Sequence, residues 1–165
     1  MTYTTNTITQ STNIFNAVAN AQAAYATLST DDKLGLLWVI YENMGGVITP
    51  AATGAARAVF ITGLLKEVSA LSYEQQLQFM RDLVNKTNTS MTRAYGVFSN
   101  NNKLAFWYQL AEGMTKGEIV PVPSYYNLSK SGSDVFGQIA QLEFGQQITI
   151  LRKFVVEMGV DPLFA

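Results

Sequence analysis

The chain has 165 residues, of which 48% are hydrophobic and only 14% are charged, and its formal net charge is −1. A charge so close to neutral excludes the basic excess on which nucleic-acid binding depends. The chain contains neither Cys nor His, which excludes disulfides, thiolate nucleophiles, ordinary zinc sites and histidine acid–base catalysis.

The first half of the chain predicts helices separated by short breaks. A polar N-terminal arm over residues 1–13 contains a helix cap at Ser11 or Thr12. The weak helical stripe behind this cap consists of Phe15, Val18, Gln22 and Tyr25. Two acidic residues, Asp31 and Asp32, begin the next helix, which carries an apolar run over 34–44 and ends at Gly45–Gly46. A third helix begins at Thr49–Pro50, because proline suits the first helical turn.

The second half continues in the same manner. Ser72 and Gln75 match a capping box for a helix over about 73–86. The later helices are expected over 91–97, over 103–114 behind a cap at Asn100–Asn102, over 133–142, and over 146–158 with Gly159 as its end. The one long loop extends from Gly117 to Ser131. Because no segment alternates apolar and polar residues as a strand does, the predicted fold class is all-α.

Membrane insertion and catalysis have little support in the sequence. The longest apolar run, LGLLWVIY at 34–41, is far shorter than the roughly 20 residues of a membrane span. The N-terminus has neither the basic start nor the apolar stretch of a secretory signal, so a cytoplasmic protein is expected. Glu42 and Glu112 each close an apolar helix face, and no pair of acids lies within an apolar segment. We therefore expect no enzyme.

Two pairs of segments indicate an internal duplication. KLGLLWVIYENM (33–44) aligns without a gap with KLAFWYQLAEGM (103–114), a shift of 70 positions. LSYEQQLQFMRDLV (71–84) aligns with LEFGQQITILRKFV (142–155), a shift of 71 positions. Two matches at nearly one shift predict pseudo-repeats over about 30–86 and 100–158, related by a pseudo-two-fold axis within a single domain, 1–165.

The repeated segments are apolar on nearly all sides. The face shared at helical spacing in the second segment consists of Leu104, Trp107, Tyr108, Ala111 and Met114. Such helices are buried all round. Their aromatic side chains either form an ordinary core or line a slot for a long, flat, apolar ligand. Tyrosine hydroxyls, flexible methionines and small residues such as Gly35 and Gly113 favour the slot.

Several motifs in the same order resemble a known family. LLWVIYENMG, NNKLAFWYQLAEGM, PVPSYY and GQQITILRKFVVEMG resemble the N-terminal, carotenoid-binding domain of cyanobacterial orange carotenoid protein. The resemblance covers residues 14 to 161. The chain is expected to have no counterpart of the family's C-terminal regulatory domain, and so to be a free-standing helical carotenoid protein. It implies two interleaved four-helix bundles with a keto-carotenoid between them: canthaxanthin, echinenone or 3'-hydroxyechinenone.

The resemblance also implies a set of carotenoid-binding residues. Tyr41 and Trp107 match the aromatic residues that flank the carotenoid's terminal ring. The remaining positions that match the carotenoid site are Leu34, Leu37, Trp38, Ile40, Met80, Leu104, Tyr108, Met114, Val122, Pro123, Tyr126, Ile148, Arg152 and Met158. Arg152 matches a residue whose usual partner lies in the C-terminal domain. No catalytic residue and no metal ligand are implied.

The function implied by the resemblance is constitutive photoprotection, in which the bound keto-carotenoid quenches singlet oxygen. Two alternatives remain open: docking on the phycobilisome to dissipate its excitation, and carriage of the carotenoid to a C-terminal-domain homologue. The expected location is the cytoplasm, with association at the thylakoid or the phycobilisome. Exposed ring ends also favour weak homo-oligomers.

Overall fold

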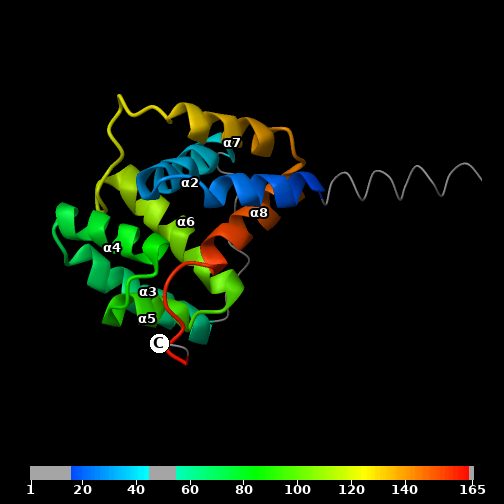
Figure 1. Ribbon diagram of the computed structural model, residues 1–165. Coiled ribbons are helices and arrows are strands. Elements are labelled where there is room, and N and C mark those ends of the chain that lie inside the picture. Colours follow the sequence, from blue (N-terminus) through cyan, green and yellow to red (C-terminus); the bar gives the residue numbers. More distant parts are fainter. Residues whose placement is uncertain (1–15, 45–54, 164–165) are drawn as a thin grey trace, which may run out of the picture.

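The structure, a computed structural model, describes residues 16–44 and 55–163. In these two ranges every regular element is a helix, as the sequence predicts (Figure 1). A helix over residues 16–26 comes first. It is followed by α2 (Thr30–Met44), α3 (Ala55–Ser69), α4 (Tyr73–Asn85), α5 (Ser90–Gly96), α6 (Asn100–Lys116), α7 (Lys130–Ala140) and α8 (Phe144–Val156). The predicted arm, the Ser11/Thr12 cap, Phe15, the Gly45–Gly46 stop and the Thr49–Pro50 start lie outside the described residues.

Local capping explains most helix boundaries. The predicted capping box before α4 is present: the Ser72 side chain accepts from the backbone of Gln75, whose side chain accepts from the backbone of Ser72. The predicted cap of α6 at Asn100–Asn102 is wrong, because the Ser99 hydroxyl accepts from the backbone N–H of Asn102 and the asparagines form the first turn. A hydroxyl side chain directly before the helix explains the earlier start.

The two later helices also differ slightly from their predicted ranges. Helix α7 starts three residues before the expected position, because Ser129 caps it by accepting from the backbone N–H of Gly132. Helix α8 starts two residues early behind Glu143. The chain after α8 turns at Gly159, whose φ of 76° favours glycine.

The aligned segments 71–84 and 142–155 form the same local structure. Gln76 Nε2 donates to the Leu71 carbonyl at 3.2 Å, and Gln147 Nε2 donates to the Leu142 carbonyl at 3.0 Å. Capping boxes precede both α4 and α8. The duplication, with its two interleaved four-helix bundles in one domain, remains a prediction.

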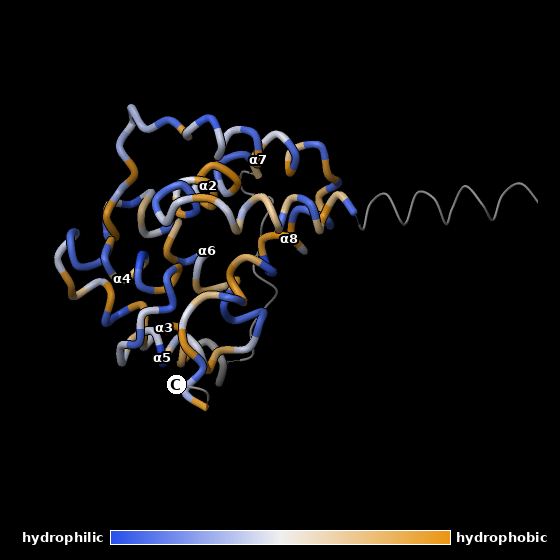
Figure 2. The backbone as a smooth tube through the Cα atoms, in the orientation of Figure 1, coloured by the Kyte–Doolittle hydropathy of each residue, from blue (hydrophilic) through white to orange (hydrophobic). Residues whose placement is uncertain are grey.

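Helices from both halves of the chain pack together. Helix α6 runs through the middle of the molecule and contacts α8, α3 and α2, while α2 also packs against α4 and α7 (Figure 1). One cluster of buried hydrophobic side chains draws on all the helices named above. Figure 2 shows hydrophobic positions interspersed with hydrophilic ones along the helices. Within the described ranges, no helix has the length and apolarity that crossing a membrane demands.

Candidate functional site

An apolar cavity of about 350 Å³ lies among α2, α4, α6, α8 and the loop that follows α6. Its volume falls in the usual range of small-molecule sites, roughly 300–1,000 Å³. The side chains and backbone that line it belong to Asp31, Leu34, Gly35, Leu37, Trp38, Tyr41, Leu77, Met80, Arg81, Leu104, Trp107, Tyr108, Ala111, Met114, Val120, Pro121, Val122, Pro123, Tyr126, Leu151 and Val155. Aromatic and aliphatic groups dominate this set, so the cavity suits an apolar guest.

Three aromatic rings form one wall of the cavity. The ring centroids of Trp38 and Tyr41 are 5.5 Å apart, and those of Tyr41 and Tyr108 are 6.0 Å apart in an edge-to-face arrangement. The Tyr41 hydroxyl donates to Glu112 Oε1 at 2.5 Å. Burial, followed by this hydrogen bond, raises the pKa of Tyr41 to about 12. The hydroxyl therefore stays protonated, and the aromatic faces remain available to a flat ligand.

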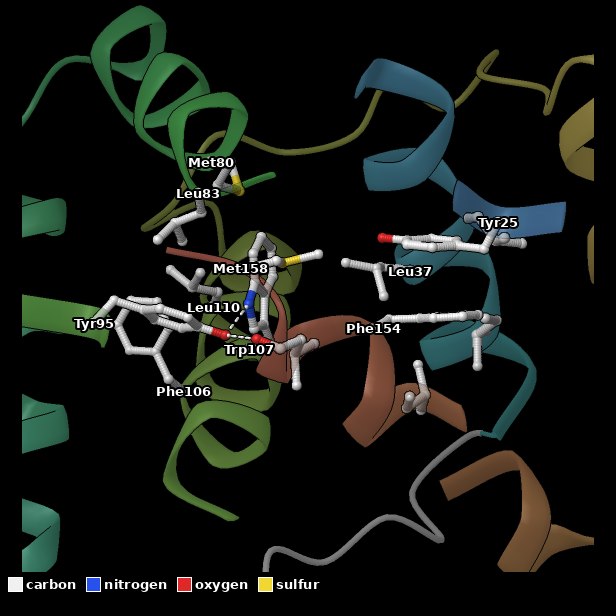
Figure 3. Close-up of a cluster of buried hydrophobic side chains, with 14 of the residues drawn as sticks. Tyr25, Leu37, Met80, Leu83, Tyr95, Phe106, Trp107, Leu110, Phe154 and Met158 are labelled. Atoms are coloured by element: carbon white, nitrogen blue, oxygen red, sulfur yellow. Dashed lines mark hydrogen bonds between the residues drawn. The ribbon is translucent and has the colours of Figure 1, made fainter. Parts of the chain in front are cut away.

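A buried hydrogen-bonded chain fixes a fourth aromatic ring of the lining, the indole of Trp107. Trp107, only 8% exposed, donates from its indole Nε1 to the Tyr95 hydroxyl at 3.1 Å. That hydroxyl donates in turn to the Val155 carbonyl at 2.5 Å (Figure 3). Because buried polar groups are costly unless paired, these two bonds hold the indole in one orientation against the cavity.

The loop between α6 and α7 closes the cavity and is tied at both ends. Val120 donates its backbone N–H to Gln76 Oε1 on α4 at 2.8 Å. Ser129 donates from Oγ to Asp32 on α2 at 2.9 Å. Between these ties, Tyr126 lies directly against Gly35, where a Cβ would come within 1.8 Å of the phenol oxygen. The loop therefore packs against α2 only because residue 35 has no side chain.

The rim of the cavity carries one ion pair. Arg81 donates from Nε and Nη2 to the two carboxylate oxygens of Asp31, at 2.8 and 3.0 Å. The hydrogen bond from Arg81 lowers the pKa of the Asp31 carboxyl below its ordinary value. Both side chains are partly solvent-exposed, so this pair contributes little to stability. Its visible effect is to join α2 to α4 beside the cavity.

Most of the predicted carotenoid-binding residues come together around this cavity. Those that line it are Leu34, Leu37, Trp38, Tyr41, Met80, Leu104, Trp107, Tyr108, Met114, Val122, Pro123 and Tyr126. Four others do not: Ile40 and Met158 are buried in the hydrophobic core, Ile148 packs against the core, and Arg152 is half-buried on α8. The lining residues also include Gly35 and Ala111, which the sequence placed at the slot but not among the carotenoid-binding residues. The lining residues that the sequence did not indicate are Asp31, Leu77, Arg81, Val120, Pro121, Leu151 and Val155.

The Tyr41–Glu112 contact predicts a stability change at high pH. Because the folded-state pKa of Tyr41 is about 12 and the unfolded value is about 10, its contribution is complete below about pH 10 and is lost as the pH rises toward 12. Urea unfolding of the wild type and of Tyr41→Phe, at about pH 9 and about pH 11, measures the free energy of unfolding at each pH. Between these two pH values, we expect the variant to lose less stability than the wild type.

Other tyrosines with raised pKa values, such as Tyr25 and Tyr95, contribute to this loss in both proteins. The difference between wild type and variant therefore isolates Tyr41. Tyr125→Phe, which removes a hydroxyl from a ring that is 83% exposed, is the matched control. Equal losses in the wild type and in Tyr41→Phe would contradict the expected coupling.

Substitution of Gly35 by alanine tests how the loop is held. The new Cβ overlaps the phenol of Tyr126, so the ring and its loop must move away from α2. We expect faster proteolysis within residues 117–129 and a loss of stability of about 1–2 kcal/mol. Gly145→Ala, where a Cβ meets nothing within 4 Å, is the control. Unchanged proteolysis of the loop in Gly35→Ala would rule out the Tyr126 contact as its anchor.

Comparison of the sequence with known protein families shows which family contains this chain. The sequence profile of the family described as "Orange carotenoid protein, N-terminal" matches residues 11–161. The chain belongs to this family. The family resemblance predicted from the sequence motifs is thereby confirmed. Within the part of the chain that the structure describes, no group of acidic residues is arranged to hold a metal ion.

Relatives in cyanobacteria differ in how much of their length they share with this family member. An orange carotenoid-binding domain-containing protein of Nostoc sp. is 54% identical over 148 residues, covering 90% of this chain and 86% of the relative. The orange carotenoid-binding protein of Synechocystis sp. is 44% identical over 137 residues, covering 83% of this chain and 43% of the relative. The chain thus spans somewhat under half of the longer relative.

Solved structures confirm the fold. The orange carotenoid protein of Anabaena (Nostoc) sp., in a structure that binds canthaxanthin, superposes with a TM-score of 0.83 at 42% identity over 89% of this chain and 48% of its own. The red carotenoid protein of the same organism, also binding canthaxanthin, gives a TM-score of 0.75 at 36% identity over 86% of this chain and 97% of its own. The predicted all-α class and the fold of this family are therefore confirmed.

Proposed function

We propose that this chain binds a keto-carotenoid in the cavity among α2, α4, α6 and α8 and protects against light by quenching singlet oxygen. The observation that carries the proposal is the apolar cavity lined by the aromatic rings of Trp38, Tyr41, Tyr108 and Trp107. Canthaxanthin in the structures of two relatives supports this choice of ligand.

The residues of the cavity fit such a pigment. Aromatic rings stack on a conjugated ring, and the methionines Met80 and Met114 adapt to an irregular apolar surface. The loop 117–129 shields the guest from water by means of Val122 and Tyr126. Burial of apolar surface, at about 25 cal/mol per Å², offsets the cost of ordering the ligand.

The protein's part in quenching is to hold and solubilise the pigment. A bound carotenoid accepts the excitation energy of singlet oxygen and releases it as heat. Tyr41 and Trp107, each fixed by a hydrogen bond, would hold a terminal ring between them and exclude water from it. The proposal assigns no catalytic residue to the chain, and it places the protein in the cytoplasm.

Production in a bacterial host that makes canthaxanthin tests the proposal. We expect an orange or red protein that shortens the lifetime of singlet-oxygen emission at 1:1 pigment loading, whereas the pigment-free protein should leave that lifetime nearly unchanged. A purified protein without visible absorption would refute carotenoid binding. A coloured protein with no effect on the emission would refute the quenching role alone.

Energy quenching at the phycobilisome is a second candidate, and Arg152 favours it. This residue lies outside the cavity and is half-buried; its Nε is buried without a hydrogen-bond partner among the described residues, none of which forms an ion pair with its guanidinium. An arginine without a partner is suited to an acidic contact on another protein. Phycobilisome fluorescence, measured with the loaded wild type and with loaded Arg152→Leu, separates the two roles. A decrease with the wild type only would support docking.

A further inference from the structure

Two buried tyrosines lie at equivalent positions shortly before the two predicted repeats. Tyr25 and Tyr95 are 70 positions apart, which is the shift between the segments that start at Lys33 and Lys103. The Lys33 ammonium lies 5.6 Å from the centre of the Tyr25 ring, and the Lys103 ammonium lies 5.5 Å from that of Tyr95. The two tyrosine rings therefore have the same local setting.

Their hydroxyls have opposite hydrogen-bond status. The Tyr95 hydroxyl accepts from Trp107 and donates to the Val155 carbonyl. The Tyr25 hydroxyl is buried without a partner among the described residues, although the side chain is only 6% exposed. The position equivalent to Trp107 is occupied by Leu37, whose side chain has no hydrogen-bond donor. The two equivalent positions therefore differ in hydrogen bonding, and the buried, unpaired hydroxyl of Tyr25 destabilises the folded protein.

The unpaired hydroxyl points into the interior, toward the cavity walls. Figure 3 shows it directed toward the side of Leu37 and Met158, with Trp107 beyond them. Leu37 lines the cavity. The Tyr25 hydroxyl is thus directed toward a residue of the cavity wall, although Tyr25 does not itself line the cavity.

Packing prevents the Tyr25 ring from turning toward solvent. Its ring stacks on that of Phe154 with the centroids 3.7 Å apart and the planes 9° from parallel. Burial, with a smaller effect of Glu157, raises the pKa of the Tyr25 hydroxyl, so it remains a donor at every physiological pH. A fixed, protonated and unpaired donor favours a ligand that brings a carbonyl acceptor.

We infer that the Tyr25 hydroxyl donates a hydrogen bond to the ring carbonyl of a bound keto-carotenoid and so selects keto-carotenoids over carotenes. This inference rests on the proposed function. It requires the buried side chains of Leu37 and Met158 to change rotamer when the ring arrives, which methionine does readily. A carotene, which has no carbonyl, would leave the hydroxyl unpaired and would bind less tightly.

Competition between two pigments tests the inference. Wild type and Tyr25→Phe, which keeps the ring that stacks on Phe154, are each loaded from an equimolar mixture of canthaxanthin and β-carotene. We expect the wild type to take mainly canthaxanthin, and the bound canthaxanthin-to-carotene ratio to fall by roughly three- to tenfold in the variant. Tyr125→Phe should leave the ratio unchanged.

Vibrational spectroscopy gives a readout that does not depend on selectivity. The carbonyl stretch of bound canthaxanthin should lie at lower wavenumber in the wild type than in Tyr25→Phe, because a hydrogen bond weakens the C=O bond. An unchanged ratio together with an unchanged carbonyl band overturns the inference and leaves carotenoid binding intact. Failure of the wild type to bind either pigment refutes the proposed function itself.

Thermal unfolding of the pigment-free proteins checks the premise with a matched pair of variants. Tyr95→Phe removes two hydrogen bonds and should lower the melting temperature. Tyr25→Phe removes a hydroxyl without a partner and should leave the melting temperature unchanged or raise it. A decrease in Tyr25→Phe similar to that in Tyr95→Phe would mean that the protein itself satisfies the Tyr25 hydroxyl, and it would overturn the inference.

Discussion

Replacement of Trp107 by alanine is expected to lower the free energy of unfolding by about 3–5 kcal/mol. The indole is 8% exposed, and it fills the space between the cavity and the hydrophobic core. Its removal enlarges the cavity, and surrounding side chains can collapse into the gap only in part. It also takes away the donor that reaches the Tyr95 hydroxyl, so packing and hydrogen bonding are lost together.

Urea unfolding at neutral pH measures this effect, and Trp107→Phe separates its two causes. The phenylalanine keeps an aromatic ring but lacks the N–H, so it should lose much less stability than the alanine variant. In the pigment-loaded protein, Trp107→Ala combined with Tyr41→Ser should shift or remove the visible absorption band. A loss of less than about 1 kcal/mol in Trp107→Ala would show that the indole does not support the core.

Replacement of Gly96 by alanine is expected to cost about 3 kcal/mol, a large effect for one methyl group. A Cβ at residue 96 would lie 1.9 Å from the carbonyl oxygen of Val160 and 2.5 Å from its carbonyl carbon. Both are backbone atoms, and the backbone N–H of Val160 donates to the Thr92 carbonyl at 3.1 Å. The segment that follows α8 must therefore shift as a whole and break this bond.

Gly137→Ala is the matched control for this substitution. Gly137 also lies in a helix, and a Cβ there meets nothing within 4 Å. Alanine at that position should stabilise the protein by about 0.5–1 kcal/mol, because glycine weakens a helix interior. Thermal unfolding of both variants compares them. Equal effects of the two substitutions would disprove the close approach at Gly96.

The helical fold was predictable because apolar periodicity and capping residues act locally. The Ser72–Gln75 box was recognised since its two bonds join residues three positions apart. The cap of α6 was misplaced by one residue, because Ser99 and the asparagines after it are all good capping residues. Residue preferences alone do not distinguish between neighbouring capping residues of this kind, and the packing of the whole helix decides which of them is the cap.

The predicted site residues reach the cavity where one helix face was well defined, and their part in carotenoid binding stays a prediction. Leu34, Leu37, Trp38 and Tyr41 follow helical spacing and all line the cavity, whereas Ile40 lies to the side of that face of α2 and is buried in the core. On that helix, periodicity alone separates Ile40 from the residues that line the cavity.

Helix α8 gave no such guidance, because it is apolar on adjacent faces. The sequence favoured Ile148 and Arg152, but the cavity is lined by Leu151 and Val155. Which face turns inward depends on the packing of α8 against α6, a contact between distant parts of the chain. The same limit explains why Val120 and Pro121 were missed in the loop.

The packing of first-half helices on second-half helices has a consequence for how the chain reaches its native state. Helix α3 packs against α6, and α2 packs against α7. In the turn after α8, the backbone N–H of Gly159 donates to the Leu83 carbonyl at 2.9 Å. Each half of the polypeptide therefore leaves part of its apolar surface to be covered by the other. Completion of the core must wait for contacts between residues distant in the sequence, which slows folding.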